Sequence, residues 1–325
     1  MKTDFTALPP AMDGSPFVLV ITGPTATGKT ALGVQLALDL DGEVVSADSM
    51  QLYRHMDIGT AKPRPQETLG ITHHMIDIIS PRTDYSVARY VEDAGACIDD
   101  ILARGKLPIL VGGTGLYIES LLSGRSFADT DGDEKLRESL DTEYEALGGE
   151  VMLKRLYEFD PQRGEKLNPR DKRRIIRAIE VYMLTGKTIT QHDFETQMLP
   201  PRYPSFKLAL SFDSREDLYK RIDLRVDEML RLGLAKEVQS LLDSGVPKDC
   251  TAMQAIGYKE LVSHLLCGSS LDEAAEIIKR ESRRYAKRQL TWLRRDKSVN
   301  WILWDAVPDI DNARQLLTNF FLSRN

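Results

Sequence analysis

A glycine-rich segment, Gly23-Pro-Thr-Ala-Thr-Gly28-Lys29-Thr30, constrains the fold of this chain more than any other feature. It follows the apolar run Phe17–Thr22, which is typical of a buried parallel strand, and it precedes a helical pattern over Thr30–Leu40. A strand, a GxxxxGKT loop and a helix in this order are typical of a phosphate-binding loop, in which backbone N–H groups surround the anion. Lys29 would then reach the outer phosphate, and the Thr30 hydroxyl could hold Mg²⁺. The alternative is a glycine turn that binds no ligand.

Four further short apolar runs predict strands, and helical patterns separate most of them. These runs are Glu43–Ala47, Leu107–Val111, Leu208–Phe212 and Trp301–Trp304. Strands that alternate with helices indicate an α/β fold with a mostly parallel sheet. Together with the glycine-rich loop, this pattern predicts a core like that of the P-loop NTPases.

One part of the chain differs from the rest. Residues 129–200 are charged, helical in pattern and poor in strand signals, and a proline-rich stretch at 200–204 marks their end. We therefore predict an all-helical domain, inserted into a core that is formed by residues 17–128 and 201–325. Residues 1–16 contain early charges and two adjacent prolines but no apolar signal segment, which predicts a flexible N-terminal arm.

Apolar content and cysteine usage both favour a protein of the cytoplasm. No window approaches 18 consecutive apolar residues, so the sequence predicts no transmembrane helix. The three cysteines, Cys97, Cys250 and Cys267, share no CxxC spacing, which argues against a disulfide framework and against a zinc site. We expect a cytoplasmic protein with no membrane partner.

Charge is distributed unevenly along the chain. With 43 Lys and Arg against 49 Asp and Glu, the formal net charge of −6 argues against a general polyanion binder. Residues 279–297 nevertheless carry nine Lys and Arg with two acids, and residues 170–177 carry five with one acid. Such a local excess predicts a nucleic-acid surface on an otherwise acidic protein, and the alternative is a pair of solvated basic helices.

A second glycine-rich turn follows the expected strand Leu107–Val111, which runs into Gly112-Gly113-Thr114-Gly115. An enzyme that hydrolyses a nucleoside triphosphate needs a carboxylate at the end of a core strand to organise Mg²⁺, and no carboxylate stands here. The phosphate ligand could therefore be a diphosphate that is not a nucleotide. The Thr114 hydroxyl could contact a phosphate oxygen or the reacting group.

An aspartate, Asp48, follows the second expected strand. Because the carboxyl ends of parallel strands meet at one crevice, Asp48 should lie near the phosphate-binding loop. A carboxylate in that place suits a general base or a ligand of Mg²⁺. The alternative is a cap for the turn that follows.

Some conspicuous residues are better interpreted as structural. The helical pattern around Glu273–Arg295 places Tyr285 and Trp292 at core spacing, so we expect them in the core rather than against a base. The pair His73 and His74 lacks a third ligand at suitable spacing, which favours a structural or substrate-adjacent role over metal binding.

The motifs of this chain, taken in order, resemble those of the tRNA dimethylallyltransferases, also called tRNA isopentenyltransferases. The resemblance spans roughly residues 17–300 and points to the bacterial type, because no CxxC…HxxxH pattern follows Arg295. The segments that carry it are GPTATGKT (23–30), SADSMQLYRHMDIGTAKP (46–63), HHMIDI (73–78), YSVARY (85–90), PILVGGTGLYIESLLSG (108–124), DKRRIIRAIEVYMLTGK (171–187), RIDLRVDEMLRLGLAKEV (221–238), QAIGYKEL (254–261) and YAKRQLTWLRR (285–295).

The resemblance implies an activity, substrates and a cofactor. The family transfers a dimethylallyl group from dimethylallyl diphosphate to N6 of the adenosine that lies 3′ of the tRNA anticodon, and diphosphate is released. The expected partners are therefore tRNA, through its anticodon stem-loop, and dimethylallyl diphosphate, with Mg²⁺ held by Thr30. We expect the protein to act as a monomer.

The resemblance also implies roles for individual residues. Asp48 would take the proton from N6, with Thr114 at the reaction centre and Lys29 stabilising the leaving group. The residues implied to bind the diphosphate are Gly23, Pro24, Thr25, Ala26, Thr27, Gly28, Lys29, Thr30 and Arg225. The residues implied to contact tRNA are Asp48, Ser49, Met50, Gln51, Arg137, Arg173, Arg174, Ile175, Ile176 and Arg177.

Three other functions are compatible with parts of the sequence. A small-molecule kinase could use the same core, but the missing strand-end carboxylate and the basic clusters oppose it. A prenyltransferase of free adenine nucleotides would lack much of the portion that grips tRNA, whereas residues 129–200 and 254–295 are present here. An RNA-binding protein with a vestigial phosphate loop would not need Lys29, Thr30 and Asp48 together.

Overall fold

The computed structural model describes residues 1–5, 16–124 and 133–323, and the chain divides into two compact units. The α/β unit combines Met1–Leu122 with Tyr203–Asn325, and the helical unit comprises Ser123–Arg202. The expected domain boundary at 128 and 129 lies outside the described residues, as do residues 6–15 of the expected arm.

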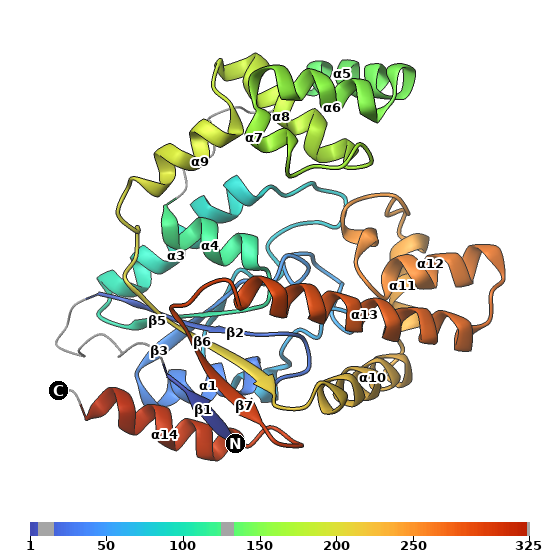
Figure 1. Cartoon of the computed structure of the whole chain (residues 1–325). Helices are drawn as coiled ribbons and strands as arrows, with labels where there is room; N and C mark the ends of the chain where they lie inside the picture. Colours follow the sequence, from blue (N-terminus) through green and yellow to red (C-terminus); the bar gives the residue numbers. More distant parts are fainter. Residues whose placement is uncertain (6–15, 125–132, 324–325) are drawn as a thin grey trace. The chain divides into compact units, whose positions relative to one another are not determined.

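A seven-stranded sheet forms the centre of the α/β unit, in the order β1-β7-β6-β2-β5-β3-β4 (Figure 1). Neighbouring strands are parallel except for β1, which runs antiparallel to β7. The predicted α/β class with a mostly parallel sheet is thereby confirmed. The strands are β1 (Lys2–Asp4), β2 (Val18–Thr22), β3 (Gly42–Ser46), β4 (His73–His74), β5 (Leu107–Val111), β6 (Ser205–Phe212) and β7 (Val299–Trp304).

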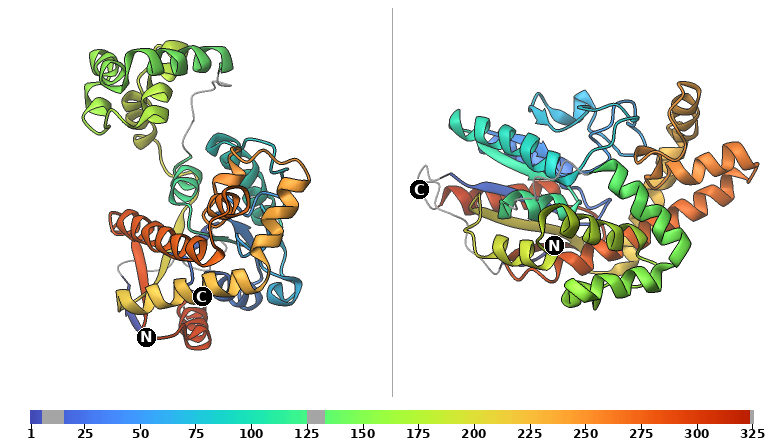
Figure 2. Two further views of the ribbon diagram at one scale, coloured as in Figure 1. Left: turned by 90° about the vertical axis from the view of Figure 1, so that its right-hand side faces the viewer. Right: turned by 90° about the horizontal axis from the view of Figure 1, so that it is seen from above.

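Helices cover both faces of this sheet. Figures 1 and 2 show α1 and α14 on one face, and α3 and α4 on the other. The helices of the α/β unit are α1 (Lys29–Asp39), α2 (Pro65–Thr68), α3 (Val87–Ala103), α4 (Gly115–Ser123), α10 (Arg215–Arg231), α11 (Leu234–Asp243), α12 (Tyr258–Cys267), α13 (Leu271–Leu293) and α14 (Ile310–Leu322), with a 3₁₀ turn η1 (Ala252–Gln254).

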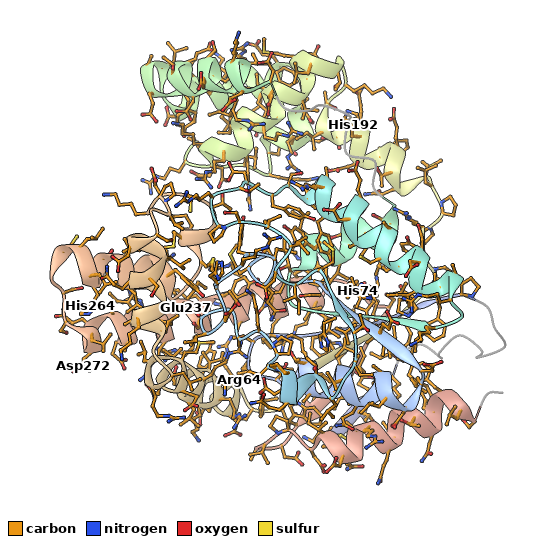
Figure 3. The ribbon with its side chains drawn as sticks, turned by 180° about the vertical axis from the view of Figure 1, so that it is seen from behind. Arg64, His74, His192, Glu237, His264 and Asp272 are labelled. Carbon is orange, nitrogen blue, oxygen red and sulfur yellow. The ribbon has the colours of Figure 1, made fainter. Side chains whose placement is uncertain are left out.

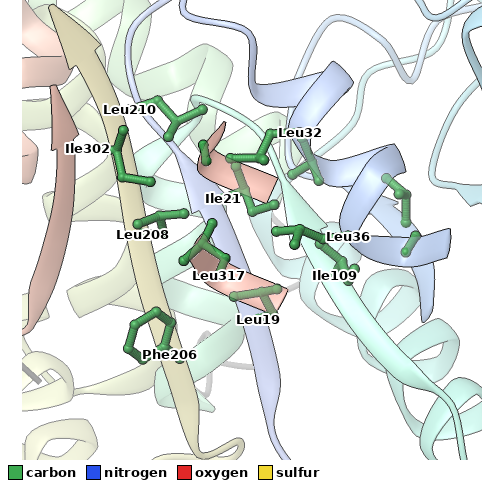
Figure 4. Packing of buried hydrophobic residues seen from close by; sticks show 14 of the residues in the cluster. Leu19, Ile21, Leu32, Leu36, Ile109, Phe206, Leu208, Leu210, Ile302 and Leu317 are labelled. Carbon is green, nitrogen blue, oxygen red and sulfur yellow. The ribbon is translucent and has the colours of Figure 1, made fainter. Parts of the chain in front are cut away.

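The core explains why the apolar runs fold as strands. Every residue of β2 and of β5 is buried, as expected for parallel strands that are covered on both faces. On one face, Leu19 and Ile21 of β2 pack against Leu32 and Leu36 of α1, and Leu317 of α14 joins the same cluster (Figure 4). Burial of such side chains stabilises the fold by about 1.5–3 kcal/mol each.

The expectation of a flexible N-terminal arm is wrong for Lys2–Asp4, which form β1 on the edge of the sheet. The three residues are polar and exposed, so no apolar pattern announces them, and their order comes from backbone pairing with β7. Two ion pairs support it: the N-terminal ammonium contacts Asp305, and Lys2 contacts Asp213, each at 2.5 Å.

The helical unit has a small apolar core of its own. Its helices are α5 (Glu134–Leu147), α6 (Gly149–Phe159), α7 (Pro161–Gly164), α8 (Lys172–Thr185) and α9 (Ile189–Gln197). Leu140 of α5, Met152 and Leu156 of α6, and Ile175 and Ile179 of α8 form that core. In the described part of the chain, no helix is long and apolar enough to cross a membrane.

Candidate active site

The topology brings three loops together. Strands β2, β5 and β3 are neighbours in the sheet, so the loops that follow their carboxyl ends meet at one edge. These loops are the phosphate-binding loop after β2, the segment with Asp48 after β3 and the second glycine turn after β5. The candidate site is therefore built from three of the strands that the sequence identifies.

The loop between β2 and α1 has the backbone shape of an anion-binding loop. Gly23 has a φ of 134°, and a Cβ atom here would lie 2.2 Å from the carbonyl oxygen of Leu210, so the position requires glycine. Ala26 (φ 66°) and Gly28 (φ 86°) also adopt left-handed conformations. Alternation of this kind makes a concavity lined by backbone N–H groups, next to the N-terminus of α1.

Side chains reinforce this shape. Thr27 donates its hydroxyl to the Pro24 carbonyl at 2.9 Å, and Trp304 of β7 donates to the Thr27 carbonyl at 3.0 Å. Of the loop, Gly23, Pro24 and Thr27 are buried, while Thr25, Ala26, Gly28, Lys29 and Thr30 remain partly exposed.

Two cations from different elements meet at this loop. Lys29, the first residue of α1, donates from Nζ to the Pro24 carbonyl at 2.8 Å. Burial is the main cause that lowers the pKa of Lys29 to about 7, and Arg225 of α10 lowers it further, while Asp48 partly opposes both. Burial also lowers the pKa of Arg225, again opposed by Asp48. Lys29, Arg225 and Asp48 thus share one electrostatic environment.

These two cations have no close acidic partner. Within the described residues, neither Lys29 nor Arg225 lies in an ion pair, whereas Lys62, Lys279 and Arg283 of the same unit each do. Two partly buried positive charges placed together are costly unless an anion accompanies them. A partly buried lysine with a lowered pKa at a glycine-rich loop therefore indicates a site for a multiply charged anion.

Asp48 lies directly after β3. Its Oδ1 accepts a hydrogen bond from the Met50 N–H at 2.9 Å, so the carboxylate caps the turn that follows. Its Oδ2 makes no hydrogen bond to another described residue. Turn capping and chemistry are therefore compatible in this residue, because each uses a different oxygen.

The second glycine turn is tied to the Asp48 segment. The Thr114 N–H donates to the Ala47 carbonyl at 3.1 Å, and the Ser49 N–H donates to Thr114 Oγ1 at 3.1 Å. The hydroxyls of Thr114 and Ser49 lie 3.5 Å apart. The structure thus brings Asp48, Ser49 and Thr114 together, as the parallel sheet predicts.

The Gln51 side chain forms hydrogen bonds within the protein, whereas a side chain that recognises a base needs its polar atoms available. Its Oε1 accepts from the Ser46 hydroxyl at 2.9 Å, and its Nε2 donates to the carbonyls of Thr60 and Ala61 at 3.2 and 3.4 Å. The amide is therefore occupied by bonds within the protein. Met50 beside it is partly exposed.

Helix α13 supplies two site residues that the sequence analysis assigned to the core or passed over. Tyr285 hydrogen-bonds to Thr114, and burial with the nearby charge of Asp48 raises the pKa of Tyr285 to about 12. Gln289 donates from Nε2 to the Gly113 carbonyl at 2.9 Å. The sequence signal that could have identified both residues is their position in the motif YAKRQLTW. Helical spacing alone does not distinguish a helix face that packs in the core from one that lines a site.

Among the described residues, no group of three or more His, Cys, Asp or Glu side chains is placed so that it could coordinate a metal ion. The pair His73 and His74 has structural contacts: His74 Nε2 lies 2.8 Å from Glu43, and His73 Nδ1 lies 2.9 Å from the Ile71 carbonyl. Thr30, the second residue of α1, offers one hydroxyl ligand at most. This donor set fits Mg²⁺ only when the ion is shared with phosphate oxygens.

The basic cluster at 279–297 is partly neutralised. On α13, Lys279 pairs with Asp227, and Arg283 pairs with Asp223. Four other cations of the cluster have no ion pair to a described residue: Lys287, Arg288, Arg294 and Arg295. These four side chains are exposed, so the cations that are available to a polyanion lie in the second half of the cluster.

In the helical unit, the residues of α8 that we expect to contact tRNA lie on two different faces of the helix. Arg173 and Arg174 are exposed, whereas Ile175 and Ile176 are 0% and 4% exposed and belong to the unit's core. The expectation that the two isoleucine side chains contact tRNA is therefore wrong in this structure. Helical periodicity is the reason, because residues 175, 176 and 179 share the inner face.

Glu180 connects the remaining two expected tRNA contacts. This side chain is fully buried and pairs with Arg137 of α5 and with Arg177 of α8, each at 2.9 Å. Glu180→Ala should lower the free energy of unfolding by roughly 1–3 kcal/mol, because two charge-assisted hydrogen bonds disappear from a buried site. Urea unfolding would measure this. Glu138→Ala, an exposed glutamate on α5, is the control, and equal stabilities for the two variants would contradict the prediction.

Comparison with known protein families gives two matches. The family described as IPP transferase matches residues 51–296, and the family described as isopentenyl transferase matches residues 16–80. Among curated proteins, the tRNA dimethylallyltransferase of Acetivibrio thermocellus is 49% identical over 302 residues, covering 93% of this chain and 95% of the relative. That of Caldanaerobacter subterraneus subsp. tengcongensis is 47% identical over 305 residues, covering 94% of this chain and 96% of the relative.

Solved structures give the same result. The tRNA isopentenylpyrophosphate transferase from Bacillus halodurans is similar with a TM-score of 0.71 at 40% identity, covering 95% of this chain and 97% of that one. A eukaryotic dimethylallyltransferase, described as acting on tRNA, is similar with a TM-score of 0.81 at 33% identity, covering 96% of this chain and 80% of that one.

Proposed function

The chain belongs to the IPP transferase family of tRNA dimethylallyltransferases, and we propose that it transfers a dimethylallyl group from dimethylallyl diphosphate to N6 of the adenosine 3′ of the tRNA anticodon. One observation carries this proposal. Lys29 and Arg225 share one electrostatic environment with Asp48 at a phosphate-binding loop, and neither cation forms an ion pair with a described residue.

The cationic pair suits the leaving group. As the allylic C–O bond breaks, positive charge develops on the carbon and negative charge on the diphosphate oxygens. Donors that are already in place where negative charge grows lower the barrier without reorganisation. Lys29, Arg225 and the backbone N–H groups of the loop 23–30, in which Pro24 has none, would be such donors.

Asp48 and Thr114 suit the acceptor. The lone pair of an adenine N6 is delocalised into the ring, so this nitrogen is a weak nucleophile. A carboxylate within about 3 Å of the amino group orients it and takes a proton as the new C–N bond forms. The oxygen Oδ2 of Asp48 is available for this, while Oδ1 holds the turn. Thr114 and Ser49 provide hydroxyls beside it.

Magnesium would bind beside the diphosphate in this scheme. The Thr30 hydroxyl would hold the ion together with diphosphate oxygens, and the ion would supply further neutralisation of the leaving group's charge. Thr25 and Thr27 belong to the same loop and complete the set that we assign to the diphosphate.

The basic surfaces suit an RNA acceptor. We assign Arg137, Arg173, Arg174 and Arg177 of the helical unit to phosphate contacts, because phosphate contacts fix the register of a protein on nucleic acid. Anticodon-loop bases can leave their stack at modest cost, which lets the target adenosine enter a pocket at Asp48. We propose that the protein acts as a monomer in the cytoplasm. The three cysteines, which are not joined in disulfides, support the cytoplasmic location.

The test uses the purified protein with dimethylallyl diphosphate, Mg²⁺ and a synthetic anticodon stem-loop, and it follows the mass of the RNA base. We expect one dimethylallyl group per RNA and none on AMP. The matched control is the same RNA with inosine at the target position, which lacks the N6 amino group and should remain unmodified. Equal transfer to AMP would redirect the proposal to free nucleotides, and phosphate transfer from ATP without prenyl transfer would replace it with a kinase.

A further inference from the structure

A carboxylate outside the active site, that of Glu237, fixes the loop that follows the Asp48 segment in the sequence. Glu237 lies on α11 and is labelled in Figure 3. Its carboxylate accepts hydrogen bonds from three consecutive backbone N–H groups, those of Asp57, Ile58 and Gly59, at 2.9, 2.8 and 3.3 Å. Three successive amides that converge on one anion form a nest, here occupied by a side chain. Charge-assisted bonds of this kind are about twice as strong as neutral ones.

The same carboxylate is itself oriented. The hydroxyl of Tyr258, on α12, donates to Glu237 Oε1 at 2.5 Å. The Tyr258 ring is fully buried and packs so closely on Gly59 that a Cβ atom at this glycine would lie 2.4 Å from the ring. Glu237, Tyr258 and Gly59 thus fix the position of the loop relative to α11 and α12.

The next two residues of this loop hold Gln51. The carbonyls of Thr60 and Ala61 accept from Gln51 Nε2, and Gln51 Oε1 accepts from the Ser46 hydroxyl. Ser46 ends β3, so Gln51 closes the segment 46–51 on itself. That segment contains Asp48, whose Oδ1 is already engaged with the Met50 N–H.

We propose that Glu237 is a positioning residue, which sets the acceptor side of the active site by fixing the loop 57–61 and, through Gln51, the segment that carries Asp48. The inference rests on the proposed function, because it takes segment 46–51 as the place where the adenosine binds. Glu237 lies 189 residues after Asp48 in the sequence, and its hydrogen bonds go to Asp57, Ile58, Gly59 and Tyr258. It acts through hydrogen bonds alone, so its effect should fall on the RNA and not on the diphosphate.

The experiment compares Glu237→Ala with Glu237→Gln and Tyr258→Phe. Loss of the carboxylate leaves three loop amides without their acceptor, and the resulting displacement of Asp48 should lower kcat/KM for the RNA stem-loop about tenfold or more. Glu237→Gln keeps an acceptor oxygen and should recover most of the activity. Tyr258→Phe removes one hydroxyl but keeps the ring, so we expect a loss of about threefold or less.

Three readouts separate positioning from general damage. The KM for dimethylallyl diphosphate and the binding of inorganic diphosphate should stay at their wild-type values, since residues 23–30 and Arg225 are not in this network. Glu228→Ala removes a glutamate whose ion pair, among the described residues, is with Arg231 on its own helix, and it should behave as wild type. In a Gln51→Ala background, Glu237→Ala should cost far less than in the wild type, because both changes break one chain of contacts.

The outcomes are distinguishable. A wild-type enzyme that modifies RNA, with Glu237→Ala unchanged or equally impaired toward both substrates, overturns the inference but not the proposed function. Full additivity of Glu237→Ala with Gln51→Ala also overturns it, since the effect then does not pass through Gln51. A wild-type protein that modifies no RNA overturns the proposed function, and the inference with it.

Discussion

Asp48→Asn should reduce kcat for transfer to an RNA stem-loop by about 10²–10⁴-fold, the range that a positioned general base contributes. The asparagine keeps an oxygen that can accept from the Met50 N–H, so the turn after β3 should survive. What disappears is the second carboxylate oxygen, which no described residue engages and which we assign to the N6 proton. Initial rates at saturating substrates measure the loss, and inorganic diphosphate should still bind.

Asp41→Asn is the matched control. Asp41 is an exposed aspartate at the other end of β3, its φ of 48° suits asparagine, and its ion pair to Lys106 spans 3.6 Å. This variant should retain wild-type rates. If Asp48→Asn kept more than a tenth of the wild-type kcat, Asp48 would be a capping residue and the base would have to be sought elsewhere.

The sequence predicts the centre of the sheet but not its edges. Strands β2 and β5 are runs of five apolar residues buried on both faces, and such runs are strong signals. Strands β1 and β4 have three and two residues, and their side chains are polar. Their structure comes from pairing with a neighbour already in place, which is information that no local pattern contains.

The site divides in the same way. Strand-end reasoning places Asp48 and Thr114 beside the phosphate-binding loop, because consecutive parallel strands fix where their loops meet. Arg225 and Tyr285 come from α10 and α13, which return to the site after long stretches of chain, and Glu237 of α11 reaches only the loop 57–59 beside it. Periodicity places Tyr285 on the inner side of α13, where the residue is partly buried, but periodicity alone does not distinguish a core from a site.

Assigning roles from a family motif fails for a different reason, because the motif does not say to which side of a helix each residue points. It places the stretch Arg173 to Arg177 against tRNA as a block, although a helix turns its residues to different sides. The structure separates the exposed Arg173 and Arg174 from the buried Ile175 and Ile176. A residue-level assignment therefore needs the periodicity of the helix as well as the motif.

Lys29→Met should lower kcat/KM for dimethylallyl diphosphate by about 10²–10³-fold, which is the usual cost of removing one donor from a developing anion. Methionine fills a similar volume but carries no charge, so Arg225 would face the diphosphate alone. Lys248→Met, at an exposed loop lysine, is the control and should be unaffected. A loss of less than tenfold would show that the backbone amides and Arg225 suffice for the leaving group.

The pKa of Lys29, lowered to about 7 by burial and by Arg225, adds a pH dependence with a definite sign. Near pH 7 the ligand-free protein holds this proton only about half of the time, whereas a bound diphosphate favours the ammonium form. Binding should therefore take up protons, and the Lys29 contribution to affinity should fall as the pH rises above 7. Titration calorimetry with inorganic diphosphate, in buffers of different ionisation enthalpy, measures the uptake.

Lys29→Arg isolates the proton uptake by Lys29 on diphosphate binding, because arginine stays charged and cannot take up a proton. The wild type should bind more protons than Lys29→Arg between pH 7 and 9, after the titration of diphosphate itself cancels between the two proteins. The unfolded chain holds the Lys29 proton up to about pH 10.5, so the same group should make folding more favourable as the pH rises through that interval. Equal proton uptake by the two proteins would mean that Lys29 is already charged before the ligand arrives, and that the cationic pair with Arg225 is stabilised by something other than the diphosphate.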